Sequence, residues 1–146
     1  MAQGAGEPGR PDDPLSEQII GSCIEVHRHL GPGLLESAYE ECLCHELSLR
    51  DLAFRRQVEV PVLYKGISLD CRYRLDVLVD ERIVVEVKAI ERVVAVHTAQ
   101  LLTYLKLTEL EVGLLVNFNV PFLSQGLRGL THQKCSLRAP RLPGSP

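Results

Sequence analysis

Two acidic residues occupy facing positions in a predicted β-hairpin that spans residues 67–89. The segment Asp80-Glu81-Arg82 predicts the turn, and its centre is the midpoint between Asp76 and Glu86. Antiparallel pairing about this turn would set the two side chains directly opposite each other, with Cβ atoms roughly 4.5–5.5 Å apart. Carboxylates at that distance repel each other by about 4 kcal/mol at an effective dielectric constant near 20. We therefore expect either a raised pKa or a bound cation at this pair.

Lys88 lies two residues after Glu86 and so shares its strand face. Carboxylate oxygens at this spacing suit Mg²⁺ or Mn²⁺, hard ions that retain water for chemistry. An ammonium group beside them can stabilise negative charge that develops on phosphorus. The three residues indicate metal-assisted hydrolysis of a phosphate ester. On these residues alone, a solvated polar strand face without chemistry is an equally good interpretation.

Strand alternation assigns the remaining hairpin residues to two faces. Arg72 and Arg74 are predicted on the face of Asp76, and the opposite face is predicted to meet the core through Cys71, Tyr73, Leu75, Val77 and Val79. Arg72 and Arg74 could bind a phosphate backbone together with Arg55, Arg56 and Lys65. A charged solvent face is the equal alternative.

These residues require a sheet and helices to position them. Helical periodicity predicts helices at residues 15–30, 34–50 and 93–107. Alternation and apolar runs predict strands at 54–64, 67–79, 82–89, 111–118 and, as a short last strand, 134–137. This order predicts an α/β (α+β) fold with a mixed central β-sheet flanked by helices. Ser16 or Asp13 can cap the first helix, and Pro61 predicts an edge strand or a bulge.

The Gly- and Pro-rich ends, residues 1–13 and 138–146, are predicted to be disordered tails around one domain at 14–137. The five cysteines lack zinc-binding spacing, and we interpret them as small buried side chains in a reducing compartment. No signal peptide and no apolar run of ~20 residues is evident, so we expect a cytoplasmic protein without a membrane span. The net charge of -3 means that nucleic-acid binding would need a local basic patch or bound cations.

Three motifs together resemble the PD-(D/E)XK nuclease superfamily. Asp76 followed by Glu86-Val87-Lys88 resembles its core motif. Upstream, the segment Gly33 to Tyr39 is similar to the signature of the bacterial GxxExxY proteins in that superfamily. Downstream, Gln100 and Tyr104 resemble the QxxxY motif of its RecB-like nucleases. The resemblance covers nearly all of residues 15–130.

The resemblance implies a restriction-endonuclease-like core and a role for each motif residue. It implies metal ligation by Glu36, Asp76, Glu86 and the backbone carbonyl of Val87. It implies that Lys88 is the catalytic lysine and that Gln100 supports the catalytic site. The proline that usually precedes the motif aspartate is absent, and Leu75 stands in its place.

Several motif residues also have structural interpretations. Glu36 begins a helix, where an acid is favourable by roughly 0.3–1 kcal/mol without any metal. Tyr39 falls on an apolar stripe and is expected in the core. Tyr104 and His97 are candidate substrate contacts, although for His97 a capping or packing role is the stronger expectation.

The resulting hypothesis is a Mg²⁺-dependent (or Mn²⁺-dependent) nuclease that hydrolyses phosphodiester bonds of nucleic acid, with DNA preferred. The alternative is a catalytically idle nuclease-fold module that binds nucleic acid or a partner protein. Because the chain has no separate substrate domain, specificity could also come from a homo-oligomer or a partner protein.

Overall fold

The computed structural model describes residues 13–133, except for the side chains of Cys71 and Arg72. The helices are α1 (Pro14–Leu30), α2 (Glu36–Leu49) and α3 (Ala95–Thr108), with a 3-10 turn η2 (Leu123–Gln125). The strands are β1 (Phe54–Tyr64), β2 (Ile67–Val79), β3 (Ile83–Lys88), β4 (Val112–Asn117) and β5 (Leu127–Thr131).

The strands form a five-stranded mixed sheet in the order β1-β2-β3-β4-β5. β3 and β4 are parallel, and the other neighbours are antiparallel. The first four strands were predicted within one residue at each end. β5 was missed, because its sequence has only two apolar residues and a glycine. The strand predicted at residues 134–137 lies outside the described residues.

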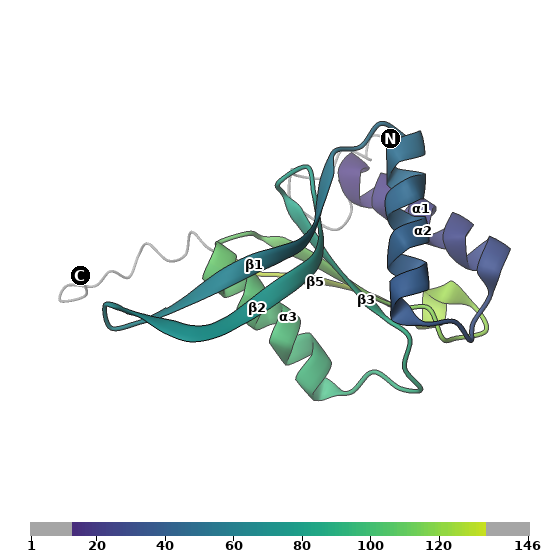
Figure 1. Cartoon of the computed structure of the whole chain (residues 1–146). Helices are drawn as coiled ribbons and strands as arrows, with labels where there is room; N and C mark the ends of the chain where they lie inside the picture. Colours follow the sequence, from purple (N-terminus) through teal and green to yellow (C-terminus); the bar gives the residue numbers. More distant parts are fainter. Residues whose placement is uncertain (1–12, 134–146) are drawn as a thin grey trace.

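Helices cover both faces of the sheet, as predicted (Figure 1). α1 and α2 pack on one face, around a cluster that includes Tyr39, Val77 and Val85. α3 packs on the other face, around a cluster that includes Leu78 and Leu101. Every residue of β4 is buried, and all but the last, Asn117, are apolar or glycine.

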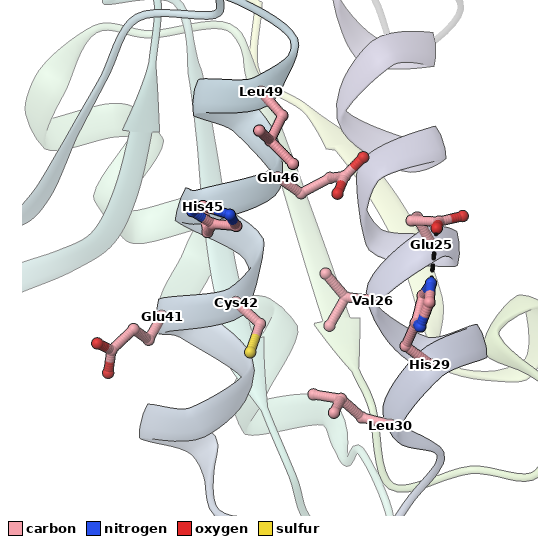
Figure 2. Close-up of a pocket in the computed structure, with 9 residues that line it drawn as sticks. All are labelled: Glu25, Val26, His29, Leu30, Glu41, Cys42, His45, Glu46 and Leu49. Carbon is pink, nitrogen blue, oxygen red and sulfur yellow. Dashed lines mark hydrogen bonds and ion pairs between the residues drawn. The ribbon is translucent and has the colours of Figure 1, made fainter.

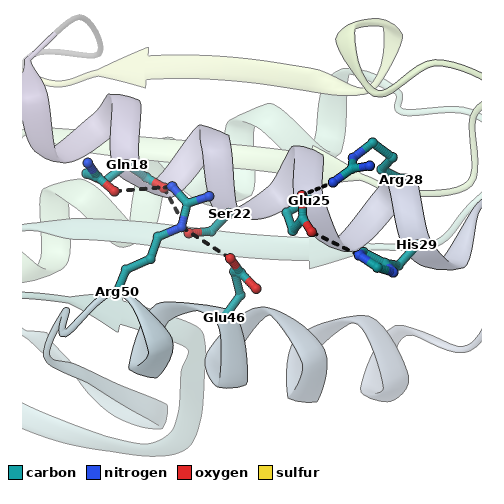
Figure 3. A network of polar contacts seen from close by, with 7 residues as sticks. All are labelled: Gln18, Ser22, Glu25, Arg28, His29, Glu46 and Arg50. Atoms are coloured by element: carbon teal, nitrogen blue, oxygen red, sulfur yellow. Dashed lines mark hydrogen bonds and ion pairs between the residues drawn. The ribbon is translucent and has the colours of Figure 1, made fainter.

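Polar contacts fasten α1 to α2 (Figure 3). Arg50 at the end of α2 donates to the backbone carbonyl and the side chain of Gln18 and pairs with Glu46 at 3.3 Å. The helices therefore do not depend on apolar packing alone for their alignment.

Asp13 belongs to the folded part, although the sequence placed it in the tail. It is 1% exposed, caps α1 by accepting from the Ser16 amide at 2.8 Å, and pairs with Arg82 at 2.6 Å. The other residues of the two predicted tails lie outside the described part of the chain.

The predicted core face of β2 is wrong at its middle. Val77 and Val79 pack in the α1/α2 cluster, whereas Leu75 packs in the α3 cluster with Leu78. In β1, Arg56 pairs with Val77 and Val58 pairs with Leu75. Gln57, between them, has a φ of 52°, which is unusual for a non-glycine residue. Both strands change faces at this position, so Tyr73 and Leu75 point to the α3 side of the sheet.

Two smaller predictions have clear outcomes. β1 is an edge strand, and its register with β2 shifts between Pro61 and Leu63, so both readings of Pro61 are confirmed. Among the described cysteines, Cys23 and Cys44 are buried as expected, but Cys42 is exposed.

Candidate active site

The carboxylates of Asp76 and Glu86 meet where β2 and β3 separate. The ladder between these strands ends at the pair Val77–Val85, and one more step of the same register sets Asp76 opposite Glu86. Beyond this point, carboxylate side chains accept the backbone amide hydrogen bonds that carbonyl groups accept elsewhere in the ladder. The Val87 amide donates to Asp76 Oδ2 at 2.8 Å, and the Asp76 amide donates to Glu86 Oε2 at 3.3 Å. The opposition predicted from the turn is therefore present in the structure.

Burial makes this pair electrostatically costly. Glu86 is only 6% exposed, and its burial together with the charge of Asp76 raises its pKa to about 8. Burial also raises the pKa of Asp76, and the charge of Glu40 acts in the same direction. A proton or a cation must relieve the repulsion.

Lys88 is the cation close to the pair. It is half-buried, and its charge acts to lower the pKa of both Asp76 and Glu86. The backbone after Lys88 is held firmly: the Lys88 carbonyl accepts from the Phe118 amide at 2.9 Å. Asn117, which is 2% exposed, also exchanges hydrogen bonds of 3.0 and 2.9 Å with the backbone of Ile90. Asn117 was not predicted as a site residue, because its contact with Ile90 depends on the packing of β4 beside β3.

Two glutamates of α2 approach from the α1/α2 side. Glu36 is exposed and accepts from the Ala89 amide at 3.3 Å, one residue beyond Lys88. Glu40 is 7% exposed and accepts from Arg56 and from Gln57, at 3.1 and 3.2 Å. Glu40 was missed, although its spacing of four from Glu36 places both on one helix face.

The loop before α2 is fixed by the residues of the Gly33–Tyr39 motif. Tyr39 is fully buried, as predicted, and its ring stacks on Phe118 with centroids 4.5 Å apart. Its hydroxyl donates to the Gly31 carbonyl and accepts from the Leu34 amide. Gly33 has a φ of 104°, a conformation that favours glycine. The motif thus positions the start of α2, where Glu36 lies.

α3 contributes Tyr104 from the opposite side of the sheet. Tyr104 is 7% exposed, and burial raises its pKa, with further contributions from the charges of Glu86 and Asp76. Gln100, one turn earlier, is exposed. His97 caps the helix, because its Nδ1 accepts from the Val94 amide at 2.9 Å. The structure therefore shows the capping role of His97 that was the stronger expectation.

The predicted basic patch is largely engaged in ion pairs. Arg55 pairs with Glu81 at 2.7 Å, and Arg56 pairs with Glu40. Arg74 lies 3.8 Å from Glu59 and, by alternation, on the face opposite to Leu75. The side chain of Arg72 lies outside the described part. A free cationic strand face is therefore not what the described residues present.

The pair fits a hard divalent cation in chemistry, but the expected third carboxylate does not join it. Asp76 and Glu86 offer buried, converging oxygens that lack a compensating proton at high pH. Within residues 13–133, no group of three His, Cys, Asp or Glu side chains is close enough to hold a metal. Glu36 instead accepts from the Ala89 amide, because Glu36 begins α2 next to the backbone that follows β3.

A surface groove lies on another part of the molecule. It has a volume of about 620 Å³ and lies between α1 and α2 (Figure 2), lined by Glu25, Val26, His29, Leu30, Glu41, Cys42, His45, Glu46 and Leu49. None of these residues contacts the carboxylate pair. We place the candidate site at the pair because chemistry, and not cavity size, identifies it.

None of the helices within the described residues combines the length and the hydropathy that a bilayer crossing requires. No curated protein and no solved structure gave a significant match to the chain. The family model of the PD-(D/E)XK nuclease superfamily matches residues 13–130. This range includes α2, the β2–β3 carboxylate pair and the helix that carries Tyr104. The chain belongs to the PD-(D/E)XK nuclease superfamily.

Proposed function

We propose that this chain is a divalent-metal-dependent nuclease that hydrolyses phosphodiester bonds of nucleic acid, with DNA as its preferred substrate. The observation that carries the proposal is the buried pair of Asp76 and Glu86, held together by crossed hydrogen bonds next to Lys88. A purely structural domain gains nothing from two facing buried carboxylates. A nuclease uses them to bind Mg²⁺ or Mn²⁺.

Asp76 and Glu86 would hold the cation, with the Val87 carbonyl as a further ligand and Glu36 joining only after a side-chain rearrangement. When bound, the cation supplies Lewis-acid polarisation of the phosphate and lowers the pKa of a water. Lys88 stabilises the negative charge that develops on the phosphate oxygens. Gln100 and Tyr104 orient the substrate from α3.

Replacement of Asp76 by Asn tests the proposal. Asp76→Asn keeps the size of the side chain but removes one charge of the pair, so Mg²⁺- or Mn²⁺-dependent cleavage should fall by at least 100-fold. Fluorescently labelled single-stranded and double-stranded DNA and RNA would be the substrates. Lys88→Ala should produce a similar loss.

Matched controls separate a chemical effect from unfolding. Asp70→Asn changes an exposed aspartate on the same strand, and Lys106→Ala changes an exposed lysine on α3. Both should cleave like the wild type. Wild-type protein that cleaves none of the four substrates but still binds one of them would favour the alternative, a nuclease-fold binding module.

A further inference from the structure

A second tyrosine, Tyr73, lies beside the candidate active site. Its ring centroid is 6.0 Å from that of Tyr104, and the two rings are tilted by 48°. Tyr104 is 7% exposed and lies near enough to Glu86 and Asp76 for their charges to raise its pKa, whereas Tyr73 is 41% exposed. Tyr73 is therefore one ring removed from the reacting centre and open to solvent.

The change of strand face near Asp76 is what brings Tyr73 to this position. Strict alternation would have placed Tyr73 and Asp76 on different faces of the sheet. Because Leu75 packs in the α3 cluster, Tyr73, two residues earlier, shares the α3 side. Its cross-strand partner in β1 is Val60, which is buried in the same cluster. Tyr73 thus lies next to buried residues of the α3 cluster while its side chain remains accessible.

A row of exposed apolar side chains lies between Tyr73 and the end of β2 at the hairpin turn. Leu69 is 37% exposed and Ile67 is 58% exposed. This row leads away from the carboxylate pair toward the β1–β2 turn, at the free end of the hairpin (Figure 1). An aromatic ring followed by apolar side chains presents flat, uncharged surface to a substrate, not phosphate-binding groups.

We propose that Tyr73 stacks on a base next to the scissile phosphate, and that the substrate is single-stranded or frayed nucleic acid. This inference rests on the proposed function. Bases inside a duplex already stack on both faces, so a phenol ring reaches only bases that have left the stack. Such stacking tolerates any base, because every base has a π-face.

A single tryptophan can report this contact directly, because the chain contains none. Tyr73→Trp in a Lys88→Ala background keeps both carboxylates and prevents cleavage. Titration with a single-stranded oligonucleotide should quench the tryptophan fluorescence, and a blunt duplex of equal length should quench it much less. The matched control is Ile24→Trp, an exposed position in α1 on the other face of the sheet, which should show little change.

Kinetics give the second measurement. Tyr73→Ala should raise the KM for single-stranded substrate about tenfold or more with a smaller effect on kcat, and Tyr73→Phe should retain wild-type values. Equal losses on single-stranded and duplex substrates, or a Tyr73→Phe variant as impaired as Tyr73→Ala, would overturn the inference.

The outcomes also separate this inference from the proposed function. Quenching of the Tyr73→Trp variant by single strands, together with a wild-type protein that cleaves nothing, would refute the nuclease and leave the stacking contact standing. Cleavage by the wild type without any quenching at position 73 would refute the stacking contact alone. Quenching that depends on protein concentration instead of oligonucleotide would identify the apolar row as a contact between copies of the chain and overturn the inference.

Discussion

At the scale of single residues, the backbone holds two carboxylates together against their mutual repulsion. The amides of Val87 and Asp76 donate to the facing side chains and fix their orientation. These two bonds compensate only part of the desolvation, because the pKa of Glu86 remains raised to about 8. The site is therefore built to accept a positive charge, and in the metal-free protein below about pH 8 that charge is a proton.

The metal-free protein should lose stability as the pH rises from 4.5 to about 8, the range between the ordinary and the folded-state pKa of Glu86. The pKa of Glu86 rises from an ordinary value of 4.5 to about 8 on folding. Its protonation therefore contributes fully to the free energy of unfolding below pH 4.5, and this contribution is lost as the pH rises to 8 and above. Glu86→Gln stays neutral and should be more stable than the wild type at pH 8.5, by about 2–4 kcal/mol. Urea denaturation in EDTA at pH 5 and 8.5 measures both quantities.

Glu91→Gln is the control for this experiment, because it removes the same charge from an exposed loop residue. It should follow the wild-type pH dependence. An equal stability difference between wild type and Glu86→Gln at both pH values would contradict the electrostatic account of the pair.

The sequence predicted the facing carboxylates because a short turn imposes its symmetry on the two strands that it joins. It did not predict the position of Tyr73, because alternation fails where Gln57 adopts a left-handed backbone conformation. Glu40 was missed for a related reason: its burial depends on contacts with Arg56 and Gln57 that come from a distant strand. Local patterns thus identified the motif residues but not their neighbours from other elements.

At the scale of elements, the end of β4 holds the segment that follows Lys88. Asn117 binds the backbone of Ile90, and the Asn117 amide donates to the Gly126 carbonyl at 2.8 Å. Gly126 approaches so closely that a Cβ atom there would lie 2.1 Å from the Asn117 carbonyl oxygen. Only glycine allows the turn before β5 to pack against β4 in this way.

Gly126→Ala should therefore destabilise the protein by roughly 1–3 kcal/mol, because backbone must move to admit the methyl group. A suitable comparison is Gly21→Ala in α1, where the nearest atoms belong to the flexible guanidinium of Arg50 and helix propensity favours alanine. Thermal unfolding followed by circular dichroism measures both. A Gly126→Ala variant as stable as Gly21→Ala would show that this contact does not position β4 and β5.

The boundaries of helices and strands were predictable where the hydrophobic periodicity was strong. β5 was not predictable, because its sequence has no such periodicity. Leu127 and Leu130 are only half-buried, and no pattern in the segment Leu127–Thr131 distinguishes it from a loop. It becomes a strand because β4 offers an unpaired edge to it. Pairing with a distant neighbour, and not local propensity, decides the structure of such a segment.

At the scale of the whole molecule, charge decides how a phosphate backbone can be bound. The chain carries a net charge of -3, and Arg55, Arg56 and Arg74 are each within an ion pair. The charge of Glu40 acts on Asp76 as well. A polyanion would be repelled by this cluster of acids unless bound cations neutralise it.

Divalent cations should therefore stabilise the folded protein through this one site. A cation present at 100 times its Kd adds about 2.7 kcal/mol, which for a domain of this size raises the Tm by about 10 °C. The Tm of the wild type should rise with added Mn²⁺ at pH 8, and that of Asp76→Asn should remain nearly constant, since the variant lacks half of the pair. Asp70→Asn serves as the charge-matched control and should respond like the wild type. If neither Mg²⁺ nor Mn²⁺ shifts the wild-type Tm, the site binds no divalent cation. This outcome would contradict the proposed metal-dependent nuclease.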